Sequence, residues 1–368
     1  MSLLHEPYTL RQLTLRNHIA VAPMCQYSCT DGLANDWHLV HLGSRAVGGA
    51  GLIFTEAAAV TQDGRITPED LGIWNDEQIE PLQRITRFIA AQGVVAGIQL
   101  AHAGRKASTW RPWLGKEGSI AADQGGWTPW GPSNIAFDPH HTAPKALDDA
   151  QIKEVIQAFV DAAKRALTAG FKVVEVHAAH GYLLHQFLSP LSNQRNDNYG
   201  GSFENRIRLT LEVTEAVRAV WPAEWPVFVR VSATDWVENG WTADETVELS
   251  KRLKAAGADL VDVSSGGSSP DAKIPVGPGY QTEFAGRVRS EASIATGTVG
   301  MITDPVQAET ILRTGQADLI LLARELLRDP YWPLGSDEAL GGRQAVWPAQ
   351  YQRATHRDQP IHESDLRD

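Results

Sequence analysis

Two histidines and a tyrosine follow a short run of β-branched residues, in the sequence VVEVHAAHGY at 173–182. The unbroken apolar run is typical of a buried parallel strand. His177, His180 and Tyr182 would then lie at its carboxyl end, where two ring N–H groups can donate to one oxygen and a phenol can supply a proton. We take these three residues as the candidate catalytic group.

The same histidines are open to other chemistry. Two histidines at this spacing are more often structural when no strand end lies beside them. They could also be two ligands of a zinc ion, which has three protein ligands in catalytic sites. His102 is the only candidate for the third ligand. A non-redox barrel enzyme with a histidine-based metal site is therefore the alternative function.

The composition favours a protein that acts on small molecules. The 368 residues carry a formal net charge of −11 and no strongly basic run, which argues against a nucleic acid or an anionic membrane as partner. No stretch of about 18 apolar residues occurs, and the start of the chain lacks the apolar core of a signal peptide. Cys25 and Cys29 are the only cysteines, too few for a disulfide framework. We expect a cytoplasmic protein.

Strand-like and helix-like segments alternate along most of the chain. The expected strands are 19–22, 52–55, 94–100, 173–176, 227–231, 260–263, 293–295 and 319–322. The expected helices are 37–47, 77–92, 148–168, 203–221, 243–256, 283–290, 305–313 and 325–328. Eight strand-then-helix units without a domain break predict an α/β fold, a single (β/α)8 TIM barrel over 1–368.

Two additions to the barrel are expected. An N-terminal β-hairpin at 8–15 precedes the first strand, and a long excursion at 103–147, rich in Trp, Pro and Gly, follows the third as a loop subdomain. The alternative fold is an open doubly wound sheet. That fold would need Gly-x-Gly-x-x-Gly after the first strand, where Pro23-Met24-Cys25-Gln26-Tyr27 stands instead.

The expected strand ends carry the groups for a flat phosphorylated cofactor. Glycines after strand seven, including Gly300, and Arg324 after strand eight match the usual phosphate site of barrels. Gln99 offers a donor and an acceptor to a heterocycle, and Arg230 stabilises negative charge on it. Flavin mononucleotide (FMN) fits these groups, because a fixed cation favours its anionic reduced form. The alternative role for Arg230 is an ion pair with Asp262 or Glu175.

Five motifs give the chain a likeness to a known family. They are APMCQY at 22–27, QLAHAGRK at 99–106, HAAHGYLL at 177–184, RNDNYGGS at 195–202 and GMIT at 300–303. With them the chain resembles the Old Yellow Enzyme family of FMN-dependent ene-reductases, in the branch similar to YqjM and the xenobiotic reductases. The resemblance covers nearly the whole chain.

The resemblance implies a role for each matching position. The residues that it implies for FMN binding are Ala22, Pro23, Met24, Cys25, Ala57, Gln99, Arg230, Gly300, Met301, Ala323 and Arg324. It implies that His177 and His180 anchor the substrate oxygen, Tyr182 donates the proton and Tyr27 lines the substrate side. Cys25 would tune the flavin potential. Ala323 departs from the family, which usually has glycine there, and alanine disfavours positive φ by roughly 1 kcal/mol or more.

The resemblance also implies the reaction and the assembly. NADPH or NADH would reduce the flavin, which then reduces the C=C bond of an α,β-unsaturated carbonyl or nitro compound in a ping-pong scheme. Hydride would pass from N5 to the β-carbon. Arg353, in QYQR at 350–353, would reach into a neighbouring subunit's site. We therefore expect a homodimer, or a homotetramer of dimers, with the segment 333–368 at the interface.

Overall fold

Eight parallel strands close into a barrel in the computed structural model, which describes residues 2–355. They are β3 (Ile19–Val21), β4 (Leu52–Ala59), β5 (Val95–Ala101), β8 (Val173–Ala178), β9 (Val227–Ser232), β10 (Leu260–Ser264), β11 (Ala295–Thr298) and β12 (Leu319–Leu322). Neighbours around the barrel follow chain order, and β12 pairs with β3 to close it. The predicted TIM barrel is confirmed.

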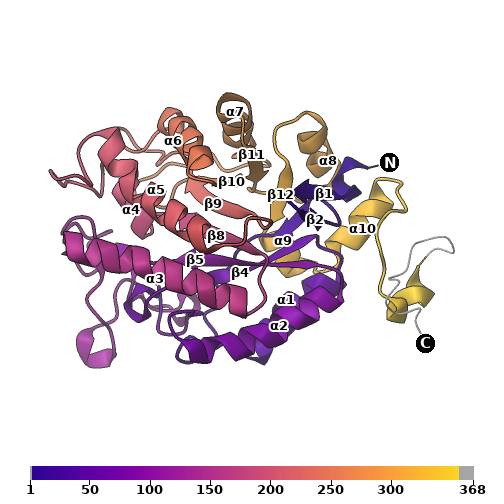
Figure 1. The fold of residues 1–368 in the computed structure, drawn as a ribbon, viewed down its shortest axis with the longest axis horizontal. Helices are drawn as coiled ribbons and strands as arrows, with labels where there is room; N and C mark the ends of the chain where they lie inside the picture. Colours follow the sequence, from indigo (N-terminus) through magenta and orange to yellow (C-terminus); the bar gives the residue numbers. More distant parts are fainter. Residues whose placement is uncertain (1, 356–368) are drawn as a thin grey trace.

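Helices cover the outside of the barrel, as Figure 1 shows. Those that follow barrel strands are α1 (Asp36–Val47), α2 (Ile79–Ala91), α3 (Asp149–Thr168), α5 (Phe203–Val220), α6 (Ala243–Ala255), α7 (Thr282–Ala292), α8 (Pro305–Arg313) and α9 (Arg324–Arg328). The N-cap side chains of α3 and α6, Asp148 and Thr242, each form a capping box with the residue three positions later. Such caps satisfy the free N–H groups of the first turn.

Alternate residues of each strand face two different apolar layers. On β4, Leu52 and Phe54 face the barrel interior, whereas Ile53 belongs to the layer between strands and helices. The Phe54 ring lies 5.9 Å from that of Phe228. Gly97 makes room for it, because a Cβ there would lie 2.7 Å from the ring. Large side chains therefore fill the amino-terminal half of the barrel and leave polar chemistry to the other end.

The predicted hairpin is present as β1 (Tyr8–Leu10) and β2 (Leu13–Leu15), which pair in antiparallel register. Leu13 and Leu15 pack in the same apolar cluster as Phe54 and Leu52. The hairpin therefore closes the amino-terminal end of the barrel.

Three segments differ from the expectation. The strand expected at 293–295 begins only at Ala295, because α7 runs to Ala292 and ends at Ser293 in the left-handed conformation, with φ 52°. Helix α4 (Leu183–Leu188) was not expected; all six of its residues are buried, so it has no amphipathic period. Helix α10 (Trp332–Ala339) was also missed.

The excursion at 103–147 folds as short turns and the two-residue parallel pair of β6 (Trp130–Gly131) and β7 (Lys145–Ala146). Two of its tryptophans pack against the loop after β4, whereas Trp113 is 60% exposed. Trp127 donates to the Asp63 carbonyl at 2.8 Å, and Trp130 donates to the Asp63 carboxylate at 2.7 Å. The excursion is thereby tied to the loop after β4.

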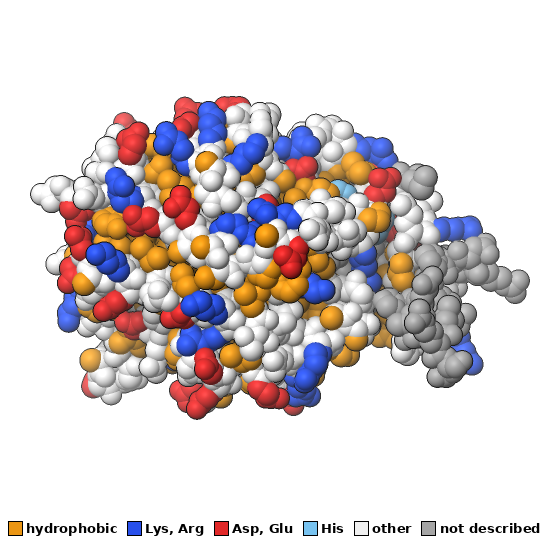
Figure 2. All heavy atoms as spheres, in the orientation of Figure 1, with side chains coloured by type: hydrophobic (Ala, Val, Ile, Leu, Met, Phe, Trp, Pro, Cys, Tyr) orange, Lys and Arg blue, Asp and Glu red, His pale blue; other side chains and the backbone are white. Residues whose placement is uncertain are grey.

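Acidic and basic side chains are interspersed on the face shown in Figure 2.

Within residues 2–355, no helix combines the length and the apolar character that crossing a bilayer requires.

We expect Phe54→Ala to lower the free energy of unfolding by about 3–5 kcal/mol, since it removes a buried ring at the centre of the barrel. Urea unfolding followed by circular dichroism measures the loss. Phe88→Ala is the matched control, because Phe88 on α2 is 39% exposed. Equal losses in the two variants would contradict the packing described above.

Candidate active site

The chain bends sharply after β8, and the bend carries two of the three candidate catalytic residues. His180 and Gly181 both have left-handed backbone conformations, with φ 59° and 73°. A Cβ on Gly181 would lie 2.0 Å from the Gly267 carbonyl oxygen, so only glycine fits. The bend therefore turns His180 back toward His177 and starts α4 at Leu183.

The rings of His177, His180 and Tyr182 come together at this point, as the spacing predicted. The ring centroids of the two histidines lie 5.2 Å apart at an angle of 80°, and Tyr182 lies 5.1 Å from His177. Burial, and then the positive charge of Arg230, hold the pKa of both imidazoles well below the usual value. Both rings are therefore neutral at pH 7, and each carries a single N–H.

Hydrogen bonds decide which nitrogen of each ring can donate. The Ala179 N–H donates to His177 Nδ1 at 3.3 Å, which leaves the proton on Nε2. His180 Nε2 lies 2.7 Å from the Ser264 hydroxyl. His180 can donate into the site only through Nδ1, and this requires the Ser264 hydroxyl to donate to Nε2 at 2.7 Å rather than to Gln281 Oε1 at 3.3 Å. Ser264 is thus a site residue to which the sequence reasoning assigned no role.

A buried pair of His185 and Asp235 supports the bend from below. The Gly181 N–H donates to His185 Nδ1 at 2.8 Å, and His185 Nε2 lies 2.9 Å from Asp235. Burial opposes ionisation of Asp235, but His185, Ser189 and Trp241 together hold the pKa of this carboxyl below its usual value. The other Asp235 oxygen accepts from the Ser189 hydroxyl at 2.5 Å and the Trp241 N–H at 2.8 Å.

Lys106 fastens the bend from the other side. Its ammonium donates to the carbonyls of His180 and Gly267, at 2.9 and 3.0 Å, and lies 5.0 Å from the centre of the Tyr182 ring. Burial, and then Arg105, lower the pKa of Lys106 to about 8. Burial raises the pKa of Tyr182 well above its usual value, so the phenol keeps its proton at neutral pH. Lys106 was quoted in a motif but given no role.

The segment after β3 lies beside Tyr182. Tyr27, with φ 49°, packs edge-on against Trp113 of the excursion at 5.8 Å. Burial, and then Asp70, raise the pKa of the half-buried Cys25 thiol well above its usual value. The Ala22 N–H donates to the Leu322 carbonyl at 3.0 Å, so this amide is already used within the barrel.

A cavity of about 240 Å³ opens beside the histidines, at the carboxyl ends of β9 to β12. It is lined by Arg230, Ser264, Tyr280, Gln281, Val299, Gly300, Met301, Ile302, Thr303, Leu321, Ala323, Arg324, Glu325 and Arg328. Five residues of the predicted FMN set, Arg230, Gly300, Met301, Ala323 and Arg324, thus share one cavity. Tyr280 and Gln281 were missed, because neither follows a strand directly.

The cavity wall corrects one expectation. Ala323 has φ −105°, so alanine meets no left-handed strain at the position where positive φ was the concern. The left-handed residues are instead Gly300, with φ 128°, and Met301, with φ 50°. A Cβ on Gly300 would lie 2.9 Å from the Gln281 amide nitrogen. Gln281 is held by a 2.8 Å bond to the Val299 carbonyl.

Four polar side chains form the floor below the histidines. Gln99 Nε2 donates to Glu175 at 2.8 Å, and Arg230 Nε lies 2.9 Å from Asp262 Oδ2. The alternative ion pair of Arg230 with Asp262 is therefore present. This ion pair involves Arg230 Nε, and Arg230 lines the cavity as well. The ion pair and the flavin role are therefore compatible. Ala57 pairs with Gln99 across β4 and β5.

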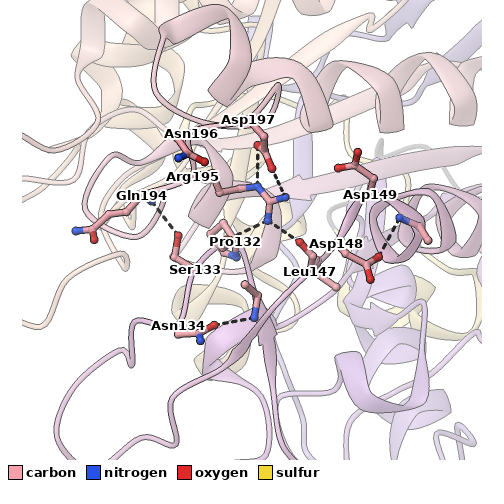
Figure 3. Close-up of a pocket in the computed structure, with 12 residues that line it drawn as sticks. Pro132, Ser133, Asn134, Leu147, Asp148, Asp149, Gln194, Arg195, Asn196 and Asp197 are labelled. Carbon is pink, nitrogen blue, oxygen red and sulfur yellow. Dashed lines mark hydrogen bonds and ion pairs between the residues drawn. The ribbon is translucent and has the colours of Figure 1, made fainter.

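A second hollow, of about 740 Å³, lies away from these residues, between the excursion and the start of α3 (Figure 3). Arg195 crosses it and donates to the carbonyls of Pro132 and Leu147, at 3.1 and 2.6 Å, while pairing with Asp197 at 2.6 Å. These bonds tie the RNDNYGGS motif to the excursion and account for Arg195.

Two further expectations concern a metal site and the role of Arg353, and neither forms part of the site described above. Within residues 2–355, no three His, Cys, Asp or Glu side chains are grouped so as to hold a metal ion. His102 Nδ1 instead accepts from the Gly104 N–H at 3.0 Å. Arg353 is exposed on η7 (Ala349–Ala354), which stands apart from the barrel in Figure 1. Its role at a neighbouring subunit stays a prediction.

The chain matches known proteins along nearly its full length. Residues 3–340 match the model of the NADH:flavin oxidoreductase / NADH oxidase family. An NADPH dehydrogenase of Geobacillus sp. (strain WCH70) is 50% identical over 342 residues, covering 92% of this chain and 95% of the relative. One of Geobacillus thermodenitrificans (strain NG80-2) is 49% identical over 354 residues, covering 96% of this chain and 98% of the relative.

A solved structure shares the fold. The old yellow enzyme homologue from Zymomonas mobilis is 26% identical, with a TM-score of 0.77. The match covers 91% of this chain and 92% of that chain.

We expect Asp235→Asn to lower the free energy of unfolding by roughly 1–3 kcal/mol. The amide N–H₂ of asparagine would face either His185 Nε2–H or the Ser189 and Trp241 donors, and a donor that faces another donor leaves a buried hydrogen bond unmade. Urea unfolding at pH 7 measures the loss. Asp244→Asn is the control, since the Asp244 side chain is 85% exposed in its pair with Arg287. A loss no larger than that of the control would show that the bend does not depend on the Asp235 charge.

Proposed function

Because the chain belongs to the NADH:flavin oxidoreductase / NADH oxidase family, we propose that it reduces the C=C bond of α,β-unsaturated carbonyl or nitro compounds. The protein is an oxidoreductase with FMN as cofactor and NAD(P)H as reductant. The convergence of the His177, His180 and Tyr182 rings beside the cavity is the observation that carries the substrate assignment.

The residues present fit FMN. Gly300 leaves a cradle that a Cβ would fill, and Arg324 lines the same cavity, which suits a phosphate. Gln99 uses its amide nitrogen on Glu175 and keeps its oxygen for an N–H of a heterocycle, while Arg230 places a cation at the cavity floor. Ala22, Pro23, Met24, Cys25, Ala57, Met301 and Ala323 complete the proposed set. When bound, FMN accepts hydride from NAD(P)H and passes it to the second substrate.

The two imidazoles hold the substrate oxygen. Negative charge builds on this oxygen as hydride reaches the β-carbon, and His177 Nε2–H and His180 Nδ1–H donate to it. Both rings are neutral and already fixed by Ala179 and Ser264, so little reorganisation is needed. Loss of one such donor typically costs about 10²–10³ in rate.

Tyr182 then gives its proton to the α-carbon. The phenol is protonated at neutral pH, as a donor must be, and it lies next to the His177 ring. The Lys106 ammonium over its ring stabilises the negative charge that the phenol acquires. Tyr27 and Trp113 border the same side and shape the substrate's entry.

Replacing both His177 and His180 by Ala should abolish reduction of 2-cyclohexenone while FMN stays bound, since both donors to the developing charge are lost. Stopped-flow absorbance separates the steps: NADPH should still bleach the flavin, and the enone should no longer restore its colour. His140→Ala, an exposed histidine on the excursion, is the control. Undiminished turnover by the double variant would rule the assignment out.

We also propose that the protein assembles as a homodimer or as a homotetramer of dimers. Val40 of α1 is 67% exposed, and Leu327, Tyr331 and Tyr351 are exposed as well. Arg45 of α1 donates to the Leu326 carbonyl at 3.0 Å, so α1 adjoins the start of this C-terminal region. A second copy covering these apolar groups would bring Arg353 near a neighbouring site. Residues 356–368 of the expected interface segment lie outside the described part of the chain.

Val40→Glu should therefore shift the protein toward the monomer, because it places a charge in the covered face. Light scattering after size-exclusion chromatography gives the mass. Val306→Glu on α8 is the matched control, since Val306 is a valine that is 58% exposed on another helix. If both variants keep the mass of the unaltered protein, α1 is not the interface.

Cytoplasmic location is part of the same proposal. Cys25 and Cys29 are both free thiols. Free thiols suit a reducing compartment, and NAD(P)H is available there.

A further inference from the structure

The floor of the cavity holds two buried carboxyl groups and one cation. Glu175 on β8 and Asp262 on β10 have no exposed surface, and Arg230 on β9 is 5% exposed. In the strand registers, Arg230 pairs with Asp262 on one side and with His177 on the other. Glu175 precedes His177 by two residues on β8 and pairs with Gln99 of β5, so its side chain points to the same face of the strand as His177, and the three ionisable side chains lie beneath the candidate catalytic residues.

The hydrogen bonds do not compensate a second negative charge. Glu175 Oε1 accepts from the Gln99 amide at 2.8 Å, and Glu175 Oε2 has no hydrogen-bond partner among residues 2–355. Asp262 Oδ2 lies 2.9 Å from Arg230 Nε. Both Asp262 oxygens otherwise lack hydrogen bonds within this part of the chain.

The neighbouring elements supply no other cation here. From β5 the facing group is the uncharged Gln99, and from β8 it is His177, which is neutral at pH 7. From β11 the position beside Asp262 is Gly297, which has no side chain. Arg230 is thus the one positive charge that faces the pair among the described residues of these strands.

A buried carboxylate without a compensating cation takes up a proton instead of staying ionised. Burial raises the pKa of Asp262 as well, but the guanidinium 2.9 Å away opposes this shift, so of the two carboxyls Asp262 is the one that the cation favours in its charged form. We propose that Glu175 is protonated in the resting protein and that Glu175, Asp262 and Arg230 together carry no net charge. Burial, and then the charge of Asp262, raise the pKa of Glu175 to about 8, in agreement with this assignment.

If FMN binds at the proposed site, protonation of Glu175 is coupled to reduction of the flavin. Reduction by hydride adds one negative charge to the bound flavin, and an ionised Glu175 would repel it. By reciprocal linkage, reduction raises the proton affinity of Glu175. Above about pH 8, where Glu175 is ionised in the oxidised protein, hydride arrives together with one proton from solvent, which converts the Glu175 carboxylate to the acid.

Infrared spectroscopy of the FMN-bound protein tests the proton directly, without substrate turnover. The spectrum of the unaltered protein minus that of Glu175→Gln should show the carbonyl stretch of a protonated carboxylic acid at pH 7, shifted in D₂O. Glu248→Gln, a surface glutamate paired with Arg252, should leave this band in place. A difference spectrum without the acid band overturns the proposal.

Asp262→Asn provides a second test that does not depend on the folding of Glu175→Gln. With Asp262 neutral, Arg230 is free to compensate Glu175, which should then ionise, and the acid band should disappear although Glu175 is intact. A band that persists in Asp262→Asn would show that the two carboxyls do not compete for one cation.

The midpoint potential of the flavin measures the coupling. The midpoint potential falls as the pH rises. Above about pH 8 the slope of this fall should increase in the unaltered protein by the amount expected for one additional proton per two electrons, and the increase should be absent in Glu175→Gln. Equal slopes overturn the coupling. These outcomes are distinct from those of the proposed function: an acid band in a protein that does not reduce enones would leave Glu175 assigned and the substrate class wrong.

Discussion

The close approach of two loops, after β8 and after β10, determines the direction of His180. Gly181 and Gly267 pass so near each other that neither tolerates a Cβ. Lys106 bonds the carbonyls on both sides of this contact, and the buried pair of His185 and Asp235 holds it from within the fold. The left-handed bend would be costly by itself, and it persists because these contacts leave it no alternative.

The barrel separates packing from chemistry along its axis. Rings such as Phe54 and Phe228 fill the amino-terminal half together with the hairpin. All eight strands run in the same direction, so the polar residues at or just after their carboxyl ends reach the same rim. A few charges remain below that rim. In the proposed arrangement, Arg230 can serve the flavin because Asp262 and Glu175, which share its surroundings, do not both carry a charge.

Much of this was predictable, and the failures have definite causes. The bounds of α8 and β12 agree with the expectation, because a proline start and an apolar run are local signals. Helix α4 carried no such signal, since it is buried on every side. The three catalytic candidates were found at one strand end, whereas Ser264 and Asp235 were missed because they act through residues far away in sequence.

The order of residues alone determined the barrel and the types of side chain at its rim, because hydrophobic period and strand endings are properties of neighbours along the chain. Tertiary structure decided which nitrogen of His180 is free and that Arg230 pairs with Asp262 rather than Glu175. It also gave Ala323 a negative φ. Each of these depends on which distant group lies within about 3 Å, the range of a hydrogen bond, and a linear sequence contains no such distance.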